Sequence, residues 1–568
     1  MDFIKQISRF FFAISLSLCA VPAFAQTEDW AVTATPFKMV GEEAVNNVKV
    51  NWEVRTDATS YKVYRDGTLI GETSGDTYDD YGLDVPSSHN YHVEAVKDGQ
   101  VLDTSVSQKA QTFMPTGKAA KYDNLNGQYL AQGEQAPSGF KIGDRYYSYQ
   151  INHIEKAVGD TTQRGWQVTE RISDTGLGDT WSAPRELAFY PGVKFECCGF
   201  RYNPLTGKVV LVAHYEDGEG YSAAKIYLAQ ITPQGGIEVG TMARPLGHES
   251  RDQSLFVDDD NTAYLLSAAR MNSDINIYRL DETWTKPVTL VNTVFVNQHR
   301  ETPVIVKRDG TYYFFSSKAS GWYPSQAMYA SSATMDGEWT ALREMGNNST
   351  FDAQVNNVQS RGTVRETYGL WSYHWGAQRK YKTAAGNFPR ISIMNFNAGY
   401  ASADYYRYVE FYTNEGMVPV QMGRNLTLGA TVSASTASTN GAAPTCITDG
   451  ADMNSSPYFQ GNEYPYALTV DMGREAEIAE INLSTRLTNG SETAYKYTIE
   501  GSRDGQNYEL LVDGKDNWQI GFLILPVSTT ATYRYLRLNV LGAVNVHNGN
   551  DAAWAEGVYE LAAFGKWK

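Results

Sequence analysis

Short runs of alternating apolar and polar residues fill the first part of the chain, over residues 26–115. Such runs predict β-strands with one buried face, because successive side chains of a strand point to opposite sides. The pair Asp66-Gly67 between two apolar stretches is typical of a tight hairpin turn. Turns spaced roughly ten residues apart favour a β-sandwich. The runs are VKVNW (48–52), SYKVYRDGTLIGE (60–72), TYDD (77–80) and NYHVEAV (90–96).

A weak repeat runs through residues 118–418, in which a turn is followed by an aromatic or aliphatic strand. A period of roughly 50–65 residues with several strands in each unit predicts a β-propeller, and five units predict five blades. Trp181, Trp284 and Trp339 stand in three similar phrases that close a unit, and we expect them to cover blade edges. The five repeated segments are GDRYYSYQ (143–150), GKVVLVAHYE (207–216), NTAYLLSAAR (261–270), DGTYYFFSSK (309–318) and ETYGLWSYHW (366–375).

Composition restricts the classes of partner. The chain has 568 residues, too many for one hydrophobic core, so several domains are expected. A net charge of −16 argues against nucleic acid or an anionic membrane surface as a partner. Aromatic residues make up 13% of the chain, which suits both β-sheets and the stacking of sugar rings on flat side chains. These features favour an all-β, monomeric protein that acts on neutral ligands.

The first 25 residues have the pattern of a signal peptide: a basic start, a short apolar run and a small-residue cleavage site at 23–25. Export to the periplasm, the cell surface or the medium is therefore predicted. Cys19 raises the alternative of a lipoprotein anchor, but Leu18 before it fits such a site poorly. We find no other stretch long enough to span a bilayer.

Three cysteines remain beyond the signal peptide, so the fold is expected to depend on large cores and not on disulfides. Cys197 and Cys198 are adjacent. A strained vicinal disulfide is one possibility for this pair, and the sequence favours two small core residues.

Three acidic residues stand at equivalent places in successive repeats of 118–418. Glu301 lies directly before an apolar run, Asp252 does so one repeat earlier, and Glu196 two repeats earlier. Inner strands of a propeller open onto the central channel, so these carboxylates are expected to converge on one pocket. Crowded carboxylates raise one another's pKa, so that one can stay protonated and donate. Glycoside hydrolysis needs such an acid and a second group for water or the anomeric carbon.

Two motifs around these acids resemble glycoside hydrolase family 43 over residues 120–400. They are RDQSLFVDDDNTAYLL (251–266) and RETPVIVKRDGTYYFFSS (300–317). The resemblance implies a five-bladed propeller, an inverting mechanism and no cofactor for the chemistry. It assigns the general acid to Glu301 and the tuning of that acid to Asp252. The family's usual general base, an Asp in the first blade, is replaced here by Ala136.

The exo-β-1,3-galactanases are a subgroup that also lacks this base. FECCGF (195–200) and STFDAQVNNVQS (349–360) resemble its motifs and bring in Glu196 and Gln354, while the phrase at 320–322 places Trp322 near the sugar. The subgroup's His-Gly-Gly phrase is absent, and cysteines follow Glu196 where Arg-Pro is usual. Either Gln354 or Glu196 was left as the group that handles water. Further candidates for the sugar subsite are His214, Tyr221 and Trp375.

The flanking segments resemble known binding and spacer modules. Residues 26–115 are similar to a fibronectin type III domain, with Trp52 and Tyr91 in its core. Residues 424–568 resemble the F5/8 type C domain, the fold of carbohydrate-binding module family 32, through motifs such as ITDGAD (447–452) and YALTVDMGREAEIAEINL (466–483). The second resemblance implies a structural calcium at Asp449 and Glu560, and sugar contacts by Arg486, Phe459 and Trp554.

Together these patterns predict an exported glycoside hydrolase that releases galactose from the ends of β-1,3-galactan chains. Two other activities of the same propeller, α-L-arabinofuranosidase and β-xylosidase, are the alternatives within the enzyme class. A propeller that binds glycans without cutting them is the alternative outside it. The phrase SDTGLGDTW (173–181) also loosely resembles a sialidase motif, but the sequence shows no counterpart of the channel arginines that a sialidase needs.

Overall fold

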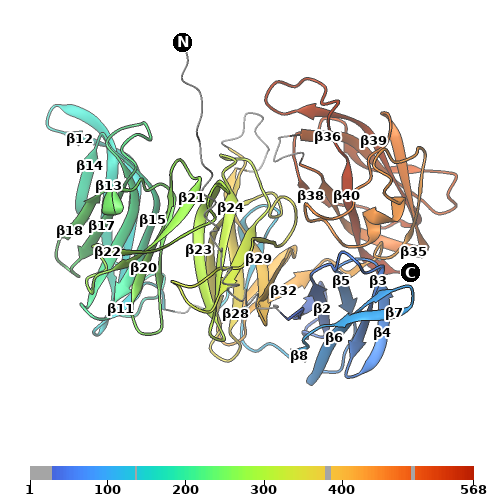
Figure 1. Ribbon diagram of the computed structural model, residues 1–568, viewed down its shortest axis with the longest axis horizontal. Coiled ribbons are helices and arrows are strands. Elements are labelled where there is room, and N and C mark those ends of the chain that lie inside the picture. Colours follow the sequence, from blue (N-terminus) through green and yellow to red (C-terminus); the bar gives the residue numbers. More distant parts are fainter. Residues whose placement is uncertain (1–28, 135–136, 378–385, 488–492) are drawn as a thin grey trace, which may run out of the picture.

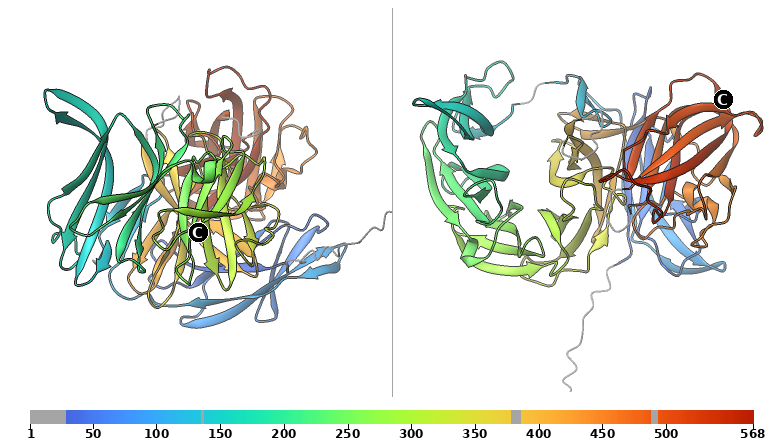
Figure 2. Two further views of the ribbon diagram at one scale, coloured as in Figure 1. Left: turned by 60° about the vertical axis from the view of Figure 1, so that its left-hand side comes forward. Right: turned by 90° about the horizontal axis from the view of Figure 1, so that it is seen from above.

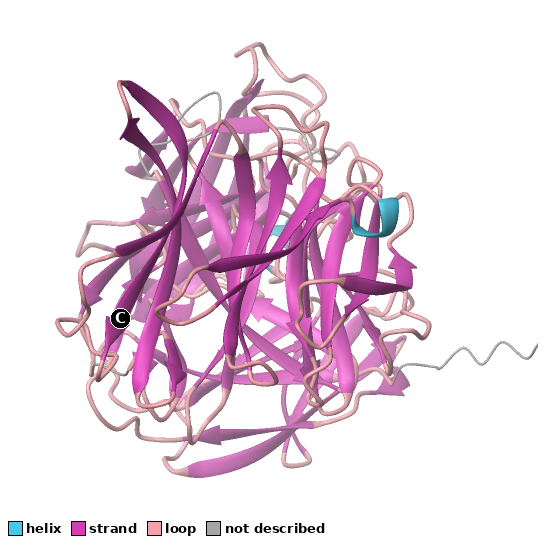
Figure 3. Cartoon of the chain, turned by 90° about the vertical axis from the view of Figure 1, so that its left-hand side faces the viewer, coloured by secondary structure: helices cyan, strands magenta, loops and turns pink. Residues whose placement is uncertain are grey.

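A computed structural model describes residues 29–134, 137–377, 386–487 and 493–568. The described chain is built almost entirely of β-strands, with two short 3₁₀ turns, η1 (Pro245–Gly247) and η2 (Pro444–Thr448) (Figures 1 and 3). The all-β class predicted from the sequence is confirmed. The predicted signal peptide and Ala136 lie outside the described residues. None of the helices in the described part is long and apolar enough to cross a membrane.

Five four-stranded antiparallel sheets follow one another along the middle of the chain, and seen from above they follow a curved path around a common centre (Figure 2). The five sequence repeats form the second strand of each sheet. The first sheet is β11 (Phe140–Ile142), β12 (Arg145–Val158), β13 (Thr161–Ser173) and β14 (Arg185–Pro191), and the second is β15 (Lys194–Asn203), β16 (Lys208–Glu216), β17 (Lys225–Ile231) and β18 (Ile237–Ala243). The third is β19 (Gln253–Val257), β20 (Ala263–Ala269), β21 (Asp274–Leu280) and β22 (Pro287–Val294). The fourth is β23 (Arg300–Arg308), β24 (Thr311–Lys318), β25 (Met328–Ser332) and β26 (Arg343–Glu344), and the fifth is β27 (Gln354–Arg361), β28 (Thr367–Trp375), β29 (Asn387–Asn397) and β30 (Tyr400–Asp404).

The second strands of the second, third and fourth sheets are buried on both faces, because each of these sheets is covered by its neighbours on either side. In β16, every residue after the first is buried. Val210 and Val212 of this strand belong to one core cluster with Leu265 of β20, so the second and third sheets share a packed interface. Trp284 lies in the same cluster and is fully buried, and Trp339 packs edge-on against Phe314 of β24.

A seven-stranded sheet joins the N-terminal segment to strands from both ends of the 118–418 region. Its order is β10 (Gln128–Ala131), β9 (Ala120–Asp123), β31 (Tyr408–Tyr412), β32 (Gly416–Gln421), β1 (Val32–Met39), β2 (Asn47–Trp52) and β5 (Thr77–Asp80). The parallel pairing of β1 with β32 brings Lys38 opposite Val420. Four strands assigned from the sequence to the propeller region therefore complete the N-terminal sheet.

A second sheet packs on this one to form the N-terminal sandwich, with Trp52 and Tyr91 fully buried between them as expected. Its strands are β4 (Thr68–Thr73), β3 (Ser60–Arg65), β6 (Ser87–Lys97), β7 (Gln100–Thr104) and β8 (Gln108–Thr112).

The C-terminal residues form an eight-stranded sheet around a large apolar cluster. This C-terminal domain lies beside the fourth and fifth sheets, above the N-terminal sandwich in Figure 1. Arg407 fixes this arrangement, because its guanidinium contacts Asp123 at 2.8 Å and Glu480 of the C-terminal sheet at 2.7 Å. The strands are β33 (Arg424–Asn425), β34 (Thr431–Ala434), β35 (Tyr466–Thr485), β36 (Thr493–Ser502), β37 (Glu509–Gly514), β38 (Phe522–Pro526), β39 (Thr532–Asn545) and β40 (Val558–Trp567).

Candidate active site

Glu196, Glu301 and Gln354 lie at the beginning of first strands in their sheets, next to β-bulges, and Asp252 directly precedes the first strand of the third sheet. In β15 the register with β16 shifts directly after Glu196, and in β23 the register with β24 shifts directly after Glu301. In β27 a shift follows one residue after Gln354. A bulge bends a strand and redirects the side chains around it. The same irregularity in three sheets therefore presents these three side chains at one end of the assembly.

Glu301 is half-buried and held by two side-chain amides. Asn272 Nδ2 donates to its Oε1 at 2.6 Å, and Gln354 Nε2 donates to its Oε2 at 3.1 Å. Burial and the nearby charge of Asp252 outweigh these hydrogen bonds and raise the pKa of Glu301 to about 8. The side chain is therefore protonated at neutral pH and can donate a proton.

Asp252 connects the strands that carry Glu196 and Glu301. Its Oδ1 accepts a hydrogen bond from Cys197 Sγ at 3.3 Å, and its Oδ2 accepts one from the backbone N–H of Thr302 at 3.2 Å. Burial is the main cause that raises its pKa, and the charge of Glu196 adds to the effect. Asp252 thus lies between the two glutamates and repels a negative charge on either of them.

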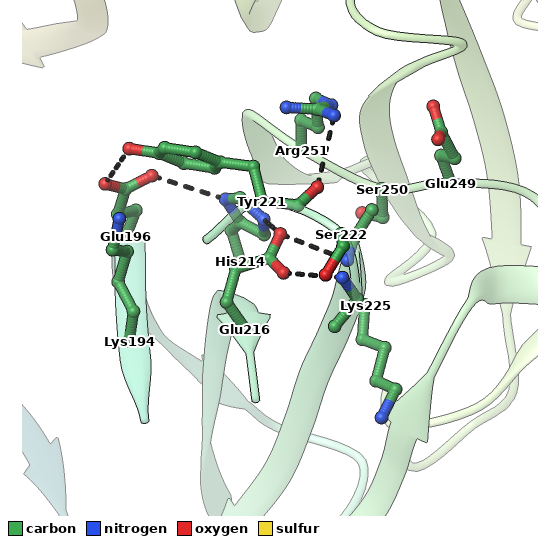
Figure 4. A network of polar contacts seen from close by, with 12 residues as sticks. Lys194, Glu196, His214, Glu216, Tyr221, Ser222, Lys225, Glu249, Ser250 and Arg251 are labelled. Atoms are coloured by element: carbon green, nitrogen blue, oxygen red, sulfur yellow. Dashed lines mark hydrogen bonds and ion pairs between the residues drawn. The ribbon is translucent and has the colours of Figure 1, made fainter. Parts of the chain in front are cut away.

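Glu196 has the opposite electrostatic surroundings from Glu301, and Figure 4 shows the side chains that contact Glu196. Tyr221 donates its hydroxyl hydrogen to Oε1 at 2.7 Å, and His214 Nδ1 lies 3.5 Å from Oε2. Burial alone would raise the pKa of Glu196, but the contacts with His214 and Tyr221 outweigh it and the pKa falls. One glutamate is therefore kept ionised while the other is kept protonated.

Gln354 is engaged at both ends of its amide. Its Nε2 donates to Glu301, and its Oε1 accepts a hydrogen bond from Trp375 Nε1 at 2.9 Å. The half-buried Trp375 thereby orients the amide. An amide oxygen takes up a proton far less readily than a carboxylate does, so the geometry gives Gln354 the role of holding Glu301 in place.

The predicted sugar-contacting residues of this region have different surroundings. Trp322 is 51% exposed in the loop after β24, and Tyr221 is 42% exposed above Glu196. Trp322 can offer a ring face to a sugar, whereas the Tyr221 ring is contacted by Lys194 at 4.0 Å and stacks on His214. His214 is only 1% exposed and lies behind Glu196, so it contacts the carboxylate and not a sugar.

The interpretation of the adjacent cysteines as core residues is wrong for Cys197, which is exposed, while Cys198 is half-buried. Both are free thiols. The bulge after Glu196 explains the difference, because it turns the backbone of Cys197 into a left-handed conformation with φ 50° and moves its side chain out of the strand's alternation.

Sequence reasoning missed three residues of the site: Asn272, Cys197 as a partner of Asp252, and Glu216. Asn272 lies in the β20–β21 turn, where Arg270, Met271 and Asn272 all have positive φ, 62° for Asn272. The pattern of apolar residues does not reveal such a backbone conformation, so it does not predict where the Asn272 side chain points. Glu216 ends an apolar strand, where an acidic residue usually meets solvent, and its burial follows only from the loop that returns over it.

The predicted contacts of the C-terminal domain are only partly supported. Phe459 is 1% exposed and belongs to the core cluster, so it packs inside the domain instead of contacting a sugar. Arg486 is occupied by Glu556 and by the hydroxyl of Tyr559. Trp554 is 43% exposed and is the predicted residue that remains open to a ligand.

Asp449 and Glu560, the predicted calcium ligands, both bind the backbone of one turn. Asp449 Oδ1 accepts the N–H of Ala451, and Glu560 Oε2 accepts the N–H of Gly450. Burial raises the pKa of Asp449 to about 7 and raises that of Glu560, where the charge of Asp449 contributes as well. Oε1 of the buried Glu560 has no hydrogen-bond partner and is therefore available to coordinate a cation. Over the described ranges, no group of three His, Cys, Asp or Glu residues is arranged to hold a metal.

Comparison with protein families identifies the class. Residues 237–399 match the model of the glycosyl hydrolases family 43, and residues 431–556 match that of the F5/8 type C domain. The chain therefore contains a family 43 glycoside hydrolase domain followed by an F5/8 type C domain, and it is a glycoside hydrolase. The first match includes Asp252, Glu301 and Gln354, whereas Glu196 lies before it.

Several solved structures are similar at low identity. An exo-β-1,3-galactanase from Clostridium thermocellum is 20% identical, with 75% of this chain and 99% of that chain covered and a TM-score of 0.44. An exo-β-1,3-galactanase from Phanerochaete chrysosporium in complex with β-1,3-galactotriose is 17% identical, with 79% and 100% covered and a TM-score of 0.46. No curated protein matches the chain significantly.

Proposed function

We propose that the protein is a secreted, monomeric, inverting hydrolase that releases galactose from the ends of β-1,3-galactan chains. The observation that carries the reaction is the opposite tuning of two glutamates at one site: the pKa of Glu301 is raised to about 8, while that of Glu196 is lowered. Hydrolysis with inversion needs one protonated and one ionised group of this kind. The five sheets serve as the blades of a five-bladed propeller.

In this mechanism Glu301 donates its proton to the glycosidic oxygen as the bond to the anomeric carbon breaks. Glu196 accepts a proton from the water that attacks the opposite face of the sugar. Asp252 keeps Glu301 protonated through its charge, and Gln354 holds the acid in position. No metal or organic cofactor enters these steps. The assignment of the base to Glu196 is supported by its lowered pKa and by the engagement of both ends of Gln354.

The choice of galactan is supported by sequence motifs. Glu196 and Gln354 occupy places that are characteristic of the exo-β-1,3-galactanases, and the name of the similar Phanerochaete structure includes a β-1,3-linked galactose trimer. The C-terminal domain would keep the enzyme near the polysaccharide by raising its local concentration. A structural calcium at Asp449 and Glu560 would stabilise that domain, since the unpartnered Glu560 oxygen offers it a ligand.

Product analysis tests the proposal. The purified protein is incubated with β-1,3-galactan, an aryl α-L-arabinofuranoside and an aryl β-xyloside, and the anomer first released is followed by proton NMR. We expect galactose from the galactan with inverted configuration, and no product from Glu301→Gln. Activity only on a pentoside would overturn the galactan assignment. Binding of galactan without any product would show a glycan-binding propeller in place of an enzyme.

A further inference from the structure

A buried histidine and a buried glutamate stand in line behind Glu196 (Figure 4). His214 and Glu216 are two residues apart on β16, so their side chains point to the same face of the sheet. The register of the sheet sets Glu196 of β15 directly opposite His214. Both His214 and Glu216 are 1% exposed. The pairing of two strands therefore places three titratable side chains in a row that leads from the core to the site.

Glu216 is fixed by the loop that follows its strand. Its Oε2 accepts the backbone N–H of Ala223 at 2.8 Å, and its Oε1 accepts that of Ala224 at 3.0 Å. Oε1 also contacts His214 Nε2 at 2.8 Å. Both oxygens of this buried carboxylate therefore have hydrogen-bond partners within the protein.

His214 lies between two carboxylates. Its Nε2 faces Glu216, and its Nδ1 faces Glu196 Oε2 at 3.5 Å. Nδ1 meets no closer hydrogen-bond partner among the described residues. Carboxylate oxygens only accept, so both contacts are attractive when each ring nitrogen carries a hydrogen. The ring then has a positive charge, which Glu216 compensates from behind and Glu196 receives in front.

We propose that His214 and Glu216 are positioning residues that keep Glu196 ionised and aimed at the attacking water. Glu216 holds the imidazole in one orientation and favours its charged form, and the charged imidazole stabilises the negative form of Glu196. This inference rests on the proposed function of Glu196 as the base. It explains why a buried histidine and a buried carboxylate in hydrogen-bond contact are placed directly behind Glu196.

Other groups also face Glu196, so the loss of one partner should weaken the effect without abolishing it. Tyr221 donates to Glu196 directly. Lys194 lies with Nζ 4.0 Å from the centre of the Tyr221 ring and lowers the pKa of Glu196 through its charge. Asp252 acts in the opposite direction, because Glu196 and Asp252 repel each other.

The first test compares the pH dependence of kcat/KM for wild type and Glu216→Gln, with Glu219→Gln as a matched control on the same loop. Glu219 is exposed. The acid limb of this profile reports the ionisation of Glu196. We expect Glu216→Gln to move the limb upward by about one pH unit, which corresponds to roughly tenfold lower kcat/KM below the limb. The value of kcat should fall while KM changes little, and Glu219→Gln should behave as wild type.

A purely structural role would have a different signature. It would lower the melting temperature and reduce kcat at all pH values by the same factor, without moving the limb, and that result would overturn the inference. Should Glu216→Gln fail to fold, His214→Gln is measured in its place, because it keeps a polar side chain of similar reach and removes the positive charge. The same upward shift is expected.

A second test needs no catalytic turnover. The potentiometric titration of Glu196→Gln is subtracted from that of wild type, which isolates the proton taken up by Glu196, and the pair is repeated in the Glu216→Gln background. We expect the midpoint to rise in that background, and equal midpoints would refute the inference. A raised midpoint in a protein that cleaves no glycan would contradict the proposed function and leave the positioning role intact. Normal cleavage with equal midpoints would refute the positioning role and leave the proposed function intact.

Discussion

Replacing Glu301 by glutamine should abolish hydrolysis and stabilise the protein at neutral pH. The pKa of Glu301 is about 8 in the folded state, against 4.5 for an unperturbed glutamate. An acid whose pKa is raised on folding loses stability as pH increases from its unfolded to its folded pKa, here from pH 4.5 to 8. At pH 7 the loss amounts to as much as about 3 kcal/mol. The Glu301→Gln variant has no charge to bury, so it does not lose this folding stability.

Thermal unfolding of both proteins between pH 4 and pH 9, followed by calorimetry, measures this difference. Near pH 4 the two melting temperatures should agree, and by pH 7 the variant should melt a few degrees higher. Asn272 can accept the new amide, because its Oδ1 has no partner and the group can turn. Glu338→Gln, on an exposed loop of the fourth sheet, is the control and should follow wild type. A difference between Glu301→Gln and wild type that does not vary with pH would refute the raised pKa.

Three further outcomes follow from the contacts described above. Phe459→Ala should destabilise the C-terminal domain by about 3–5 kcal/mol in denaturant unfolding, because it empties a core position. Trp554→Ala should leave stability unchanged and weaken galactan binding in affinity electrophoresis. The reverse pattern would contradict both assignments. Calcium should raise the melting temperature of wild type and not of Glu560→Gln, and equal responses would exclude Glu560 as a ligand. Cys197→Ala should reduce kcat because it removes the donor to Asp252. Cys197→Ser, which keeps a donor, should restore kcat. Full activity of the alanine variant would show that this contact is dispensable.

Strands of the second, third and fourth sheets could be predicted because their second strands are covered on both faces. Such a strand carries consecutive apolar residues, and the run Tyr312-Tyr313-Phe314-Phe315 of β24 shows this without any knowledge of its neighbours. The bulges after Glu196 and Glu301 could not be predicted in the same way. A bulge is defined by a mismatch between two strands, and an apolar pattern records one strand at a time. For the same reason the resemblance to the F5/8 type C domain implied a sugar contact for Phe459, although its neighbours in space enclose it.

The bulges also show how the position of the acids depends on the third sheet. Cys197 and Thr302, the residues after the two glutamates, have φ 50° and 52°, a left-handed conformation that costs roughly 1–2 kcal/mol for a residue other than glycine. Each is held by the same short segment of β19 and the residue before it. Asp252 binds Cys197 Sγ and the Thr302 N–H, and Gln253 donates to the Cys197 carbonyl at 2.9 Å. Asp252 therefore raises the pKa of the acid through its charge and also maintains the backbone geometry that aims both glutamates, so its two effects on catalysis cannot be separated by neutralising the carboxylate alone.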